Sequence, residues 1–253
     1  MRFLYNTWLY LDVLSSLSSG EDPYALKFTS SSMSPPPSPG IIPGTSPSGE
    51  EKYSLRNEID SLLGCAGDLF PLIARMSKVC NRLNDKIITL DEIQHIQDAI
   101  HIRDELREWK PPSISNLQES SDVHCSLDDI VRTAEVYRLT ALLHLFRAFP
   151  PLGKDIQKLA DSILNSLLLI PKDSGSLCIH IWPLMAAGCE HTELYKRQLV
   201  LERFEDVRER LKVANVDQAI ELLLEVWKRR DSGDVNAGWA SLARERDWNL
   251  LLG

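Results

Sequence analysis

The stretch Ile181-Trp-Pro-Leu-Met-Ala-Ala-Gly-Cys-Glu190 decides the fold. It consists almost entirely of apolar and small residues, and helical patterns flank it on both sides. A segment of this kind usually runs through the middle of a core, with other helices packed against it. We therefore predict that residues 181–190 pack the centre of the domain and contact nothing outside it.

The sequence on either side of this stretch has the periodicity of amphipathic helices. Apolar residues recur at helical spacing in eight further segments: 3–17, 68–83, 93–109, 127–149, 156–168, 192–211, 216–227 and 239–252. We find no convincing run of strands and no Gly-rich turn joining a strand to a helix. The sequence predicts an all-α fold, a single domain of about eight or nine packed helices.

Capping residues and prolines mark the helix boundaries. Gly20 is a plausible stop for the first helix, and Pro111, Pro150 and Pro171 end three later ones. N-terminal caps are predicted at Asp68, Thr89 with Glu92, Ser126 with Asp129, and Asn215 with Gln218. The helix predicted behind Thr89 carries the apolar residues Ile93, Ile96, Ile100, Leu106 and Trp109.

A Pro/Ser/Gly-rich segment interrupts the helices near the N-terminus. Residues 29–49 contain too few apolar side chains to offset the entropy of ordering the chain. We therefore expect a disordered loop at 21–58. It separates an N-terminal helix at 1–20 from the remaining helices of the same domain at 59–253.

Three serines in this loop, Ser34, Ser38 and Ser46, each precede a proline. Proline-directed phosphorylation is therefore one interpretation of the segment. The favoured interpretation is a solvated linker without a regulatory role.

Composition is that of a globular protein. The chain has 253 residues, 43% of them hydrophobic, and a net charge of −8. This acidic balance argues against a broad nucleic-acid-binding face, which needs basic side chains. The first 17 residues carry interspersed polar side chains, so they predict an amphipathic helix rather than a secretory signal. No stretch reaches the roughly 18 apolar residues of a membrane span.

The cysteines do not predict a disulfide framework. Their number is odd and their spacings are long: Cys65, Cys80, Cys125, Cys178 and Cys189. This pattern favours a reducing compartment.

One cysteine–histidine pattern raises the question of zinc. Cys178-x-His180 and Cys189-x-His191 would supply four soft ligands. Residues two apart on a helix, however, point about 200° away from each other. We therefore predict no metal site and favour buried free cysteines beside the core.

No other residue set predicts catalysis. Asp128-Asp129 begins the Asp-Asp-x-x-Asp motif by which all-α isoprenoid enzymes hold magnesium, but its fifth position is Arg132. The pair fits better in a helix first turn, where it complements the helix dipole. His144 lies in an apolar helix and is predicted to be a hydrogen-bonded core residue. We therefore assign no catalytic or cofactor-binding residue and predict no cofactor.

Two runs of basic residues are the last candidates for a binding site. Lys228-Arg229-Arg230 lies in the last turn of a predicted helix, where cations are favoured, and Lys196-Arg197 lies in the helix before it. Contact with phosphate or nucleic acid is the alternative, but no aromatic residues are interleaved with these runs. We interpret both as solvated helix faces.

Four stretches, in order along the chain, carry a family resemblance: Tyr10–Leu17, Leu62–Ile73, Ile181–Glu190, and Ala219–Asp231 continued to Asp247-Trp248. Together they resemble the C-terminal regulatory region of fungal-specific transcription factors, whose N-terminus carries a binuclear zinc cluster. The resemblance covers nearly the whole chain apart from the Pro/Ser loop.

The resemblance implies a regulator of transcription in the nucleus that contacts transcription machinery or a sister subunit. The DNA-binding part of the family is a basic segment with six cysteines that bind two zinc ions. The five scattered cysteines of this chain do not supply it, so we expect no direct DNA contact from these residues. Neither the composition nor the resemblance predicts a membrane partner.

Two other functions remain open at this stage. One is a small-molecule-sensing helical module, in which Trp182, Met185 and Trp227 would line a pocket. The other, less favoured, is an all-α isoprenoid-type enzyme built on Asp128 and Asp129.

Overall fold

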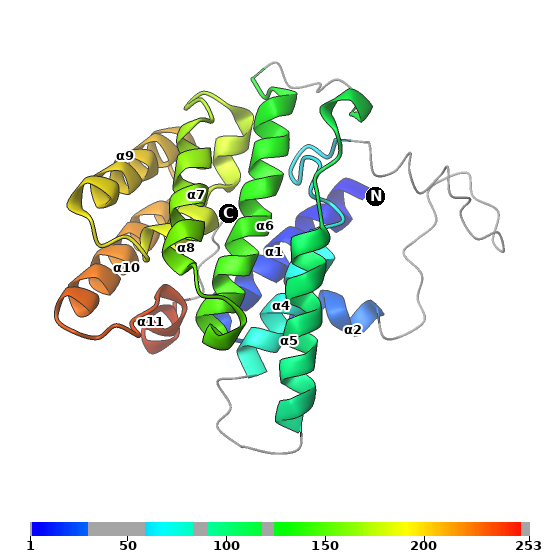
Figure 1. Ribbon diagram of the computed structural model, residues 1–253. Helices are drawn as coiled ribbons and strands as arrows, with labels where there is room; N and C mark the ends of the chain where they lie inside the picture. The colour runs from blue at the N-terminus through cyan, green and yellow to red at the C-terminus, as the bar shows by residue number, and fades with distance from the viewer. Residues whose placement is uncertain (1, 30–58, 83–90, 118–123, 249–253) are drawn as a thin grey trace.

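The computed structural model describes residues 2–29, 59–82, 91–117 and 124–248 (Figure 1). Within these ranges it contains ten α-helices and no β-strand, which confirms the all-α prediction. The helices are α1 (Arg2–Ser19), α2 (Ala25–Thr29), α4 (Phe70–Arg82), α5 (Asp91–Glu108), α6 (Leu127–Ala148), α7 (Ile156–Leu168), α8 (Ile181–Gly188), α9 (Leu194–Leu211), α10 (Ala214–Asp231) and α11 (Trp239–Glu245). Three 3-10 helices cover Ile114–Asn116, Pro150–Leu152 and Gly175–Ile179.

Helix α8 occupies the centre of one half of the molecule. Every residue from Ile181 to Glu190 is buried. Helices α6, α7, α9 and α10 all pack against α8, as Figure 1 shows on the left of the long central α6. The prediction that this stretch lies in the core is confirmed.

A row of aromatic rings joins the two halves of the core. It runs from Tyr10 on α1 through Phe70 on α4 and Tyr137 on α6 to Trp182 on α8, with centroids 5.5, 5.4 and 5.5 Å apart in that order. Tilted and edge-on arrangements of this kind stabilise aromatic pairs beyond the area that they bury. The N-terminal helix therefore packs in the same core as α8.

The predicted helix starts are partly confirmed. The Ser126 hydroxyl accepts a hydrogen bond from the Asp129 N–H at 3.1 Å and caps α6 as expected. The predicted cap at Asn215 is wrong, because α10 already begins at Ala214. Lys212 adopts a left-handed φ of 53°, and the chain reverses between α9 and α10 over Lys212 and Val213. Helix α10 therefore starts directly after this short turn. The predicted cap at Thr89 lies outside the described residues.

Helix α2 falls inside the range 21–58, for which the sequence predicted no structure. The Asp12 carboxylate, on α1, accepts the N–H groups of Tyr24 at 3.0 Å and Ala25 at 2.8 Å. It therefore caps a helix that is short of local signals. The prediction of disorder is wrong for residues 25–29, and the Pro/Ser-rich residues 30–58 lie outside the described part of the chain.

The helix predicted at 93–109 is present as α5, but not all of its apolar residues are buried. Ile93 and Ile96 are 63% and 48% exposed, whereas Ala99, Ile102 and Leu106 are buried. Figure 1 shows the first turns of α5 extending below the helices beside it. Among the described residues, the buried stripe of α5 lies where α4 and α6 pack against it.

The last helix is shorter than the predicted 239–252. Helix α11 ends at Glu245, and Asp247 adopts a left-handed φ of 53°. The Trp248 N–H then donates to the Ala243 carbonyl at 2.9 Å, which closes the helix end. None of the helices in the described ranges combines the length and hydrophobicity needed to cross a membrane.

Candidate functional site

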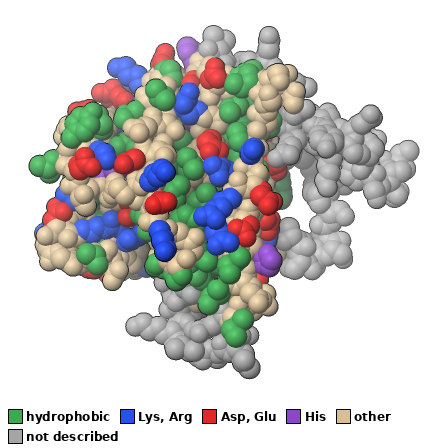
Figure 2. Space-filling view, in the orientation of Figure 1, with side chains coloured by type: hydrophobic (Ala, Val, Ile, Leu, Met, Phe, Trp, Pro, Cys, Tyr) green, Lys and Arg blue, Asp and Glu red, His purple; other side chains and the backbone are tan. Residues whose placement is uncertain are grey.

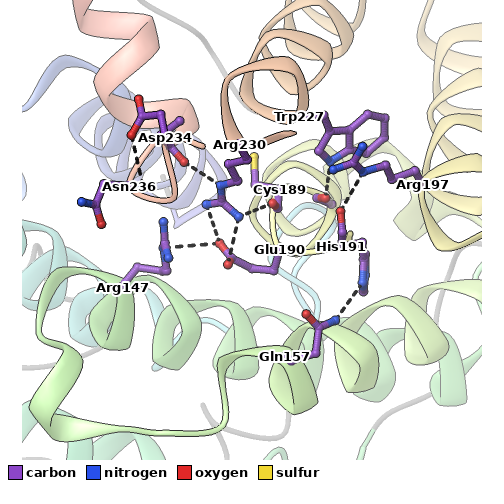
Figure 3. A network of polar contacts seen from close by, with 12 residues as sticks. Arg147, Gln157, Cys189, Glu190, His191, Arg197, Trp227, Arg230, Asp234 and Asn236 are labelled. Atoms are coloured by element: carbon purple, nitrogen blue, oxygen red, sulfur yellow. Dashed lines mark hydrogen bonds and ion pairs between the residues drawn. The ribbon is translucent and has the colours of Figure 1, made fainter. Parts of the chain in front are cut away.

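The end of α8 carries a network of buried charges (Figure 3). Glu190 follows α8 directly, and Arg230 in the last turn of α10 donates to both of its carboxylate oxygens at 3.2 Å. Arg147 on α6 adds a third charge, 3.4 Å from Glu190. Arg230 also donates to the carbonyls of Cys189 and Ala237. Side chains from α6 and α10 therefore meet the carboxylate that follows α8, and Arg230 also binds the loop after α10.

A second arginine binds the same helix end. Arg197 on α9 forms two bonds of 2.7 Å to Asp231 and donates to the His191 carbonyl at 2.9 Å. Its guanidinium lies 5.0 Å from the ring centroid of Trp227, whose Nε1 donates to the Gly188 carbonyl at 2.8 Å. Cation–π contacts of this kind stabilise a partly desolvated arginine.

These contacts give the network a structural role. A helix leaves its last carbonyls unpaired, and cations are favoured beside them. Here Trp227, Arg230 and Arg197 satisfy the carbonyls of Gly188, Cys189 and His191. The interpretation of both basic runs as solvated faces is therefore wrong for Arg197 and Arg230, although Lys228 is largely exposed. Arg230 pairs with the buried Glu190, 40 residues earlier in the chain, and Arg197 pairs with Asp231, 34 residues later. Neither basic run therefore carries a local signal of these contacts.

The two cysteine–histidine pairs lie at opposite ends of α8, about 12 Å apart for a helix of this length. His180 faces Thr133, with Nε2 3.1 Å from the hydroxyl. His191 faces Gln157 on α7, with Nδ1 3.3 Å from the amide nitrogen. The structure therefore does not bring the four side chains together, and the described residues contain no metal-binding group of three or more ligands.

Burial shifts the pKa of several titratable groups in the core. It raises the pKa of the Cys65 and Cys189 thiols to about 12. It lowers the pKa of His180 to about 3, helped by the positive charge of Arg203, and that of His144 to about 4. Thiols with a raised pKa stay protonated near neutral pH, and histidines with a lowered pKa stay neutral.

His144 differs from its prediction in one respect. Its ring packs against Trp239 of α11, with centroids 5.9 Å apart. No hydrogen bond joins its side chain to any described residue, because the ring meets an aromatic face where a polar partner was expected.

The paired aspartates diverge. Both lie in the first turn of α6, as predicted. Asp129 is buried and accepts a hydrogen bond from the Ser174 hydroxyl at 2.9 Å, whereas Asp128 is exposed. Carboxylates that point to different surroundings do not form a magnesium site.

The three residues proposed for a small-molecule pocket are core residues. Trp182 and Met185 are fully buried, and Trp227 binds the end of α8. Core packing was the commoner explanation for such side chains, and it holds here.

An open groove does exist between α4 and α5. Its volume is about 400 Å³. Pro71, Leu72 and Trp109 form its apolar part, and Asp68, Arg75, Glu105 and Glu108 form its charged part. We call these seven residues the α4–α5 groove. Sequence reasoning missed this groove, because its two sides are separated by the chain between α4 and α5.

Comparison with known protein families shows to which family the chain belongs. Residues 1–253 match the family described as fungal specific transcription factor domain. The chain belongs to this family. The resemblance seen in the four stretches is thereby confirmed, and a role in the regulation of transcription follows from membership. No curated protein and no solved structure matches the chain.

In this fungal transcription factor domain, two of the four stretches correspond to parts that hold the core together. Ile181–Glu190 is α8 with the carboxylate that follows it. Ala219–Asp231 is most of α10 and supplies Trp227, Arg230 and Asp231 to the network at the end of α8. These two stretches supply helices and polar contacts that hold the fold together.

Proposed function

We propose that this fungal transcription factor domain regulates transcription in the nucleus by binding other proteins through its helical surface, without contacting DNA itself. The observation that carries the proposal is the family match over the whole chain. Partner proteins would be components of the transcription machinery or a second copy of the chain.

The chemistry of the described residues supports this proposal. The side chains that could have served catalysis or ligand binding pack in the core or hold helices together, as Arg197, Arg230 and His180 do. The net charge of −8 opposes association with the DNA backbone. Figure 2 shows Lys and Arg side chains interspersed with Asp and Glu over the face in view, rather than gathered into one basic area.

A tethering experiment tests the proposal. The chain is fused to an unrelated DNA-binding module, and transcription is measured from a reporter gene that carries the module's site in a fungal cell. We expect the fusion to change reporter output several-fold relative to the module alone, and the untethered chain to enter the nucleus. A fusion that is folded and nuclear but leaves reporter output unchanged contradicts the proposal.

Direct DNA contact is tested separately with the purified chain. Fluorescence anisotropy of labelled duplexes with varied sequences measures binding at low salt, where contacts to phosphate are strongest. We expect no change in anisotropy at micromolar protein. Sequence-dependent binding would contradict the protein-interaction role as we state it.

A further inference from the structure

The α4–α5 groove carries an excess of negative charge. It is lined by three carboxylates and one guanidinium. Arg75 is already bound by Glu105 through two hydrogen bonds of 2.7 Å. Glu108 adds a negative charge that no described residue pairs, and Asp98, earlier on α5, adds to the negative field around Arg75.

Trp109 forms a fixed aromatic wall of the groove. Its Nε1 donates to the Asp68 carboxylate at 3.0 Å, which holds the indole in one orientation. The ring is only partly buried, so part of its surface borders the groove. Indole is the aromatic group that attracts cations most strongly.

Glu108 lies one residue before this wall. Its side chain is exposed, and no described residue forms an ion pair or hydrogen bond with it. The bonds from Arg75 to Glu105 and from Trp109 to Asp68 both serve to hold α4 against α5. That structural role does not account for Glu108, which borders the groove without holding either helix.

The apolar part of the groove suits the stem of a long basic side chain. Pro71 is exposed and Leu72 lies beneath the surface beside it. Arginine and lysine place their methylene groups along apolar surface while the charged end meets a polar partner. A volume of about 400 Å³ is near the lower end of the range for ligand pockets and accommodates such a side chain with part of its neighbours.

We propose that the α4–α5 groove binds a basic segment of a partner protein, with an arginine or lysine of the segment against the indole of Trp109 and paired with Glu108. Phosphate groups and nucleic acids are unfavourable occupants, because they would meet the carboxylates. This inference rests on the proposed interaction role of the domain and names the chemistry of one partner surface.

The indole N–H signals in a nitrogen–proton NMR spectrum test the proposal. The chain has six tryptophans, and Trp109→Phe assigns the Trp109 signal. The probe is the capped tripeptide Leu-Arg-Leu. Its matched controls are Leu-citrulline-Leu, which keeps the shape without the charge, and Leu-Glu-Leu. We expect Leu-Arg-Leu to shift the Trp109 signal most, with a millimolar dissociation constant, and both controls to bind more weakly.

Glu108→Gln tests the ion pair without disturbing the contact between α4 and α5. We expect it to weaken binding of Leu-Arg-Leu about threefold, the size of an exposed charge interaction. Glu209→Gln, an exposed position on α9, makes the same change of charge elsewhere and should leave binding unchanged. Equal binding of the citrulline peptide, a larger shift at another tryptophan, no response to Glu108→Gln, or no shift at all overturns the inference.

The reporter fusion separates this inference from the proposed function. A fusion that regulates the reporter, from a domain that does not bind Leu-Arg-Leu, refutes the groove proposal and leaves the interaction role standing. A folded, nuclear fusion without any effect on the reporter refutes the interaction role, whatever the peptide does.

Discussion

Arg230 binds both carboxylate oxygens of Glu190, each at a distance of 3.2 Å, and so joins the end of α10 to the end of α8. The two side chains are only 12% and 8% exposed. Taking two charges out of water costs free energy, which offsets much of their attraction. Removing only one partner is strongly destabilising, because the other charge is left buried and unpaired. The short central helix is thereby held in register with the helices around it.

Glu190→Gln tests this pair. The substitution keeps the shape of the side chain but leaves Arg230 and Arg147 without a counter-charge, and we expect a loss of about 3 kcal/mol in the free energy of unfolding. Urea denaturation followed by circular dichroism measures it. Glu245→Gln breaks an exposed pair with Arg229 and should cost under about 1 kcal/mol. Similar losses of stability for both variants would contradict the larger contribution that we assign to the buried pair.

Gly188 tests the close packing of α8. A Cβ atom at this position would lie 2.8 Å from Val200 Cγ1 and 3.2 Å from Leu223 Cδ1. We expect Gly188→Ala to destabilise the domain by about 1–3 kcal/mol, and Gly188→Leu to prevent folding, with partner binding lost in proportion. Gly67→Ala meets no atom within 4 Å and should change stability by less than about 0.5 kcal/mol. Thermal melting curves measure these changes in stability. A well-folded Gly188→Leu variant would contradict the tight packing of α8 against α9 and α10.

Stability should fall on mild acidification. His180 and His144 have a pKa of about 3 and about 4 in the folded state, below the ordinary value of 6.5. The unfolded chain therefore takes up protons first, and stability declines as pH falls below about 6.5. Between pH 6.5 and pH 5 each histidine costs about 2 kcal/mol. Urea titrations at a series of pH values measure this, and His180→Asn should flatten the slope. If the free energy of unfolding depends on pH equally in the variant and the wild type, His180 does not contribute to this dependence.

The cap of α6 is open to a simple test. Ser126→Ala removes the acceptor of the Asp129 N–H, and we expect a loss of about 1 kcal/mol. Ser162→Ala, on the exposed face of α7, replaces a hydroxyl that bonds only within its own helix and should leave stability unchanged or slightly higher. Differential scanning calorimetry distinguishes the two, and a neutral Ser126→Ala would contradict the role of the cap.

The parts of the fold predicted from sequence are those determined locally. Residues 181–189 are apolar or small, which favours burial, and α6 carries its own cap at Ser126. The start of α2 depends on Asp12, which reaches it from another helix, and the buried face of α5 depends on where its neighbours end. Periodicity reports how apolar a face is but not what covers it.

The polar contacts were harder to predict for the same reason. Arg197 meets Asp231 across 34 residues, and Trp109 meets Asp68 across 41. A basic run beside a helix end has the same sequence whether it is solvated or bound to a buried carboxylate. The α4–α5 groove, formed between two helices, is visible only in the folded chain.

The most direct test of the proposed role measures reporter transcription from the tethered domain across the stability variants. If the folded helical domain regulates transcription, output should follow the fraction folded: wild-type levels for Gly67→Ala and Glu245→Gln, lower levels for Glu190→Gln, and none for Gly188→Leu. Equal output from Gly188→Leu and the wild type, at equal protein levels in the nucleus, would contradict it.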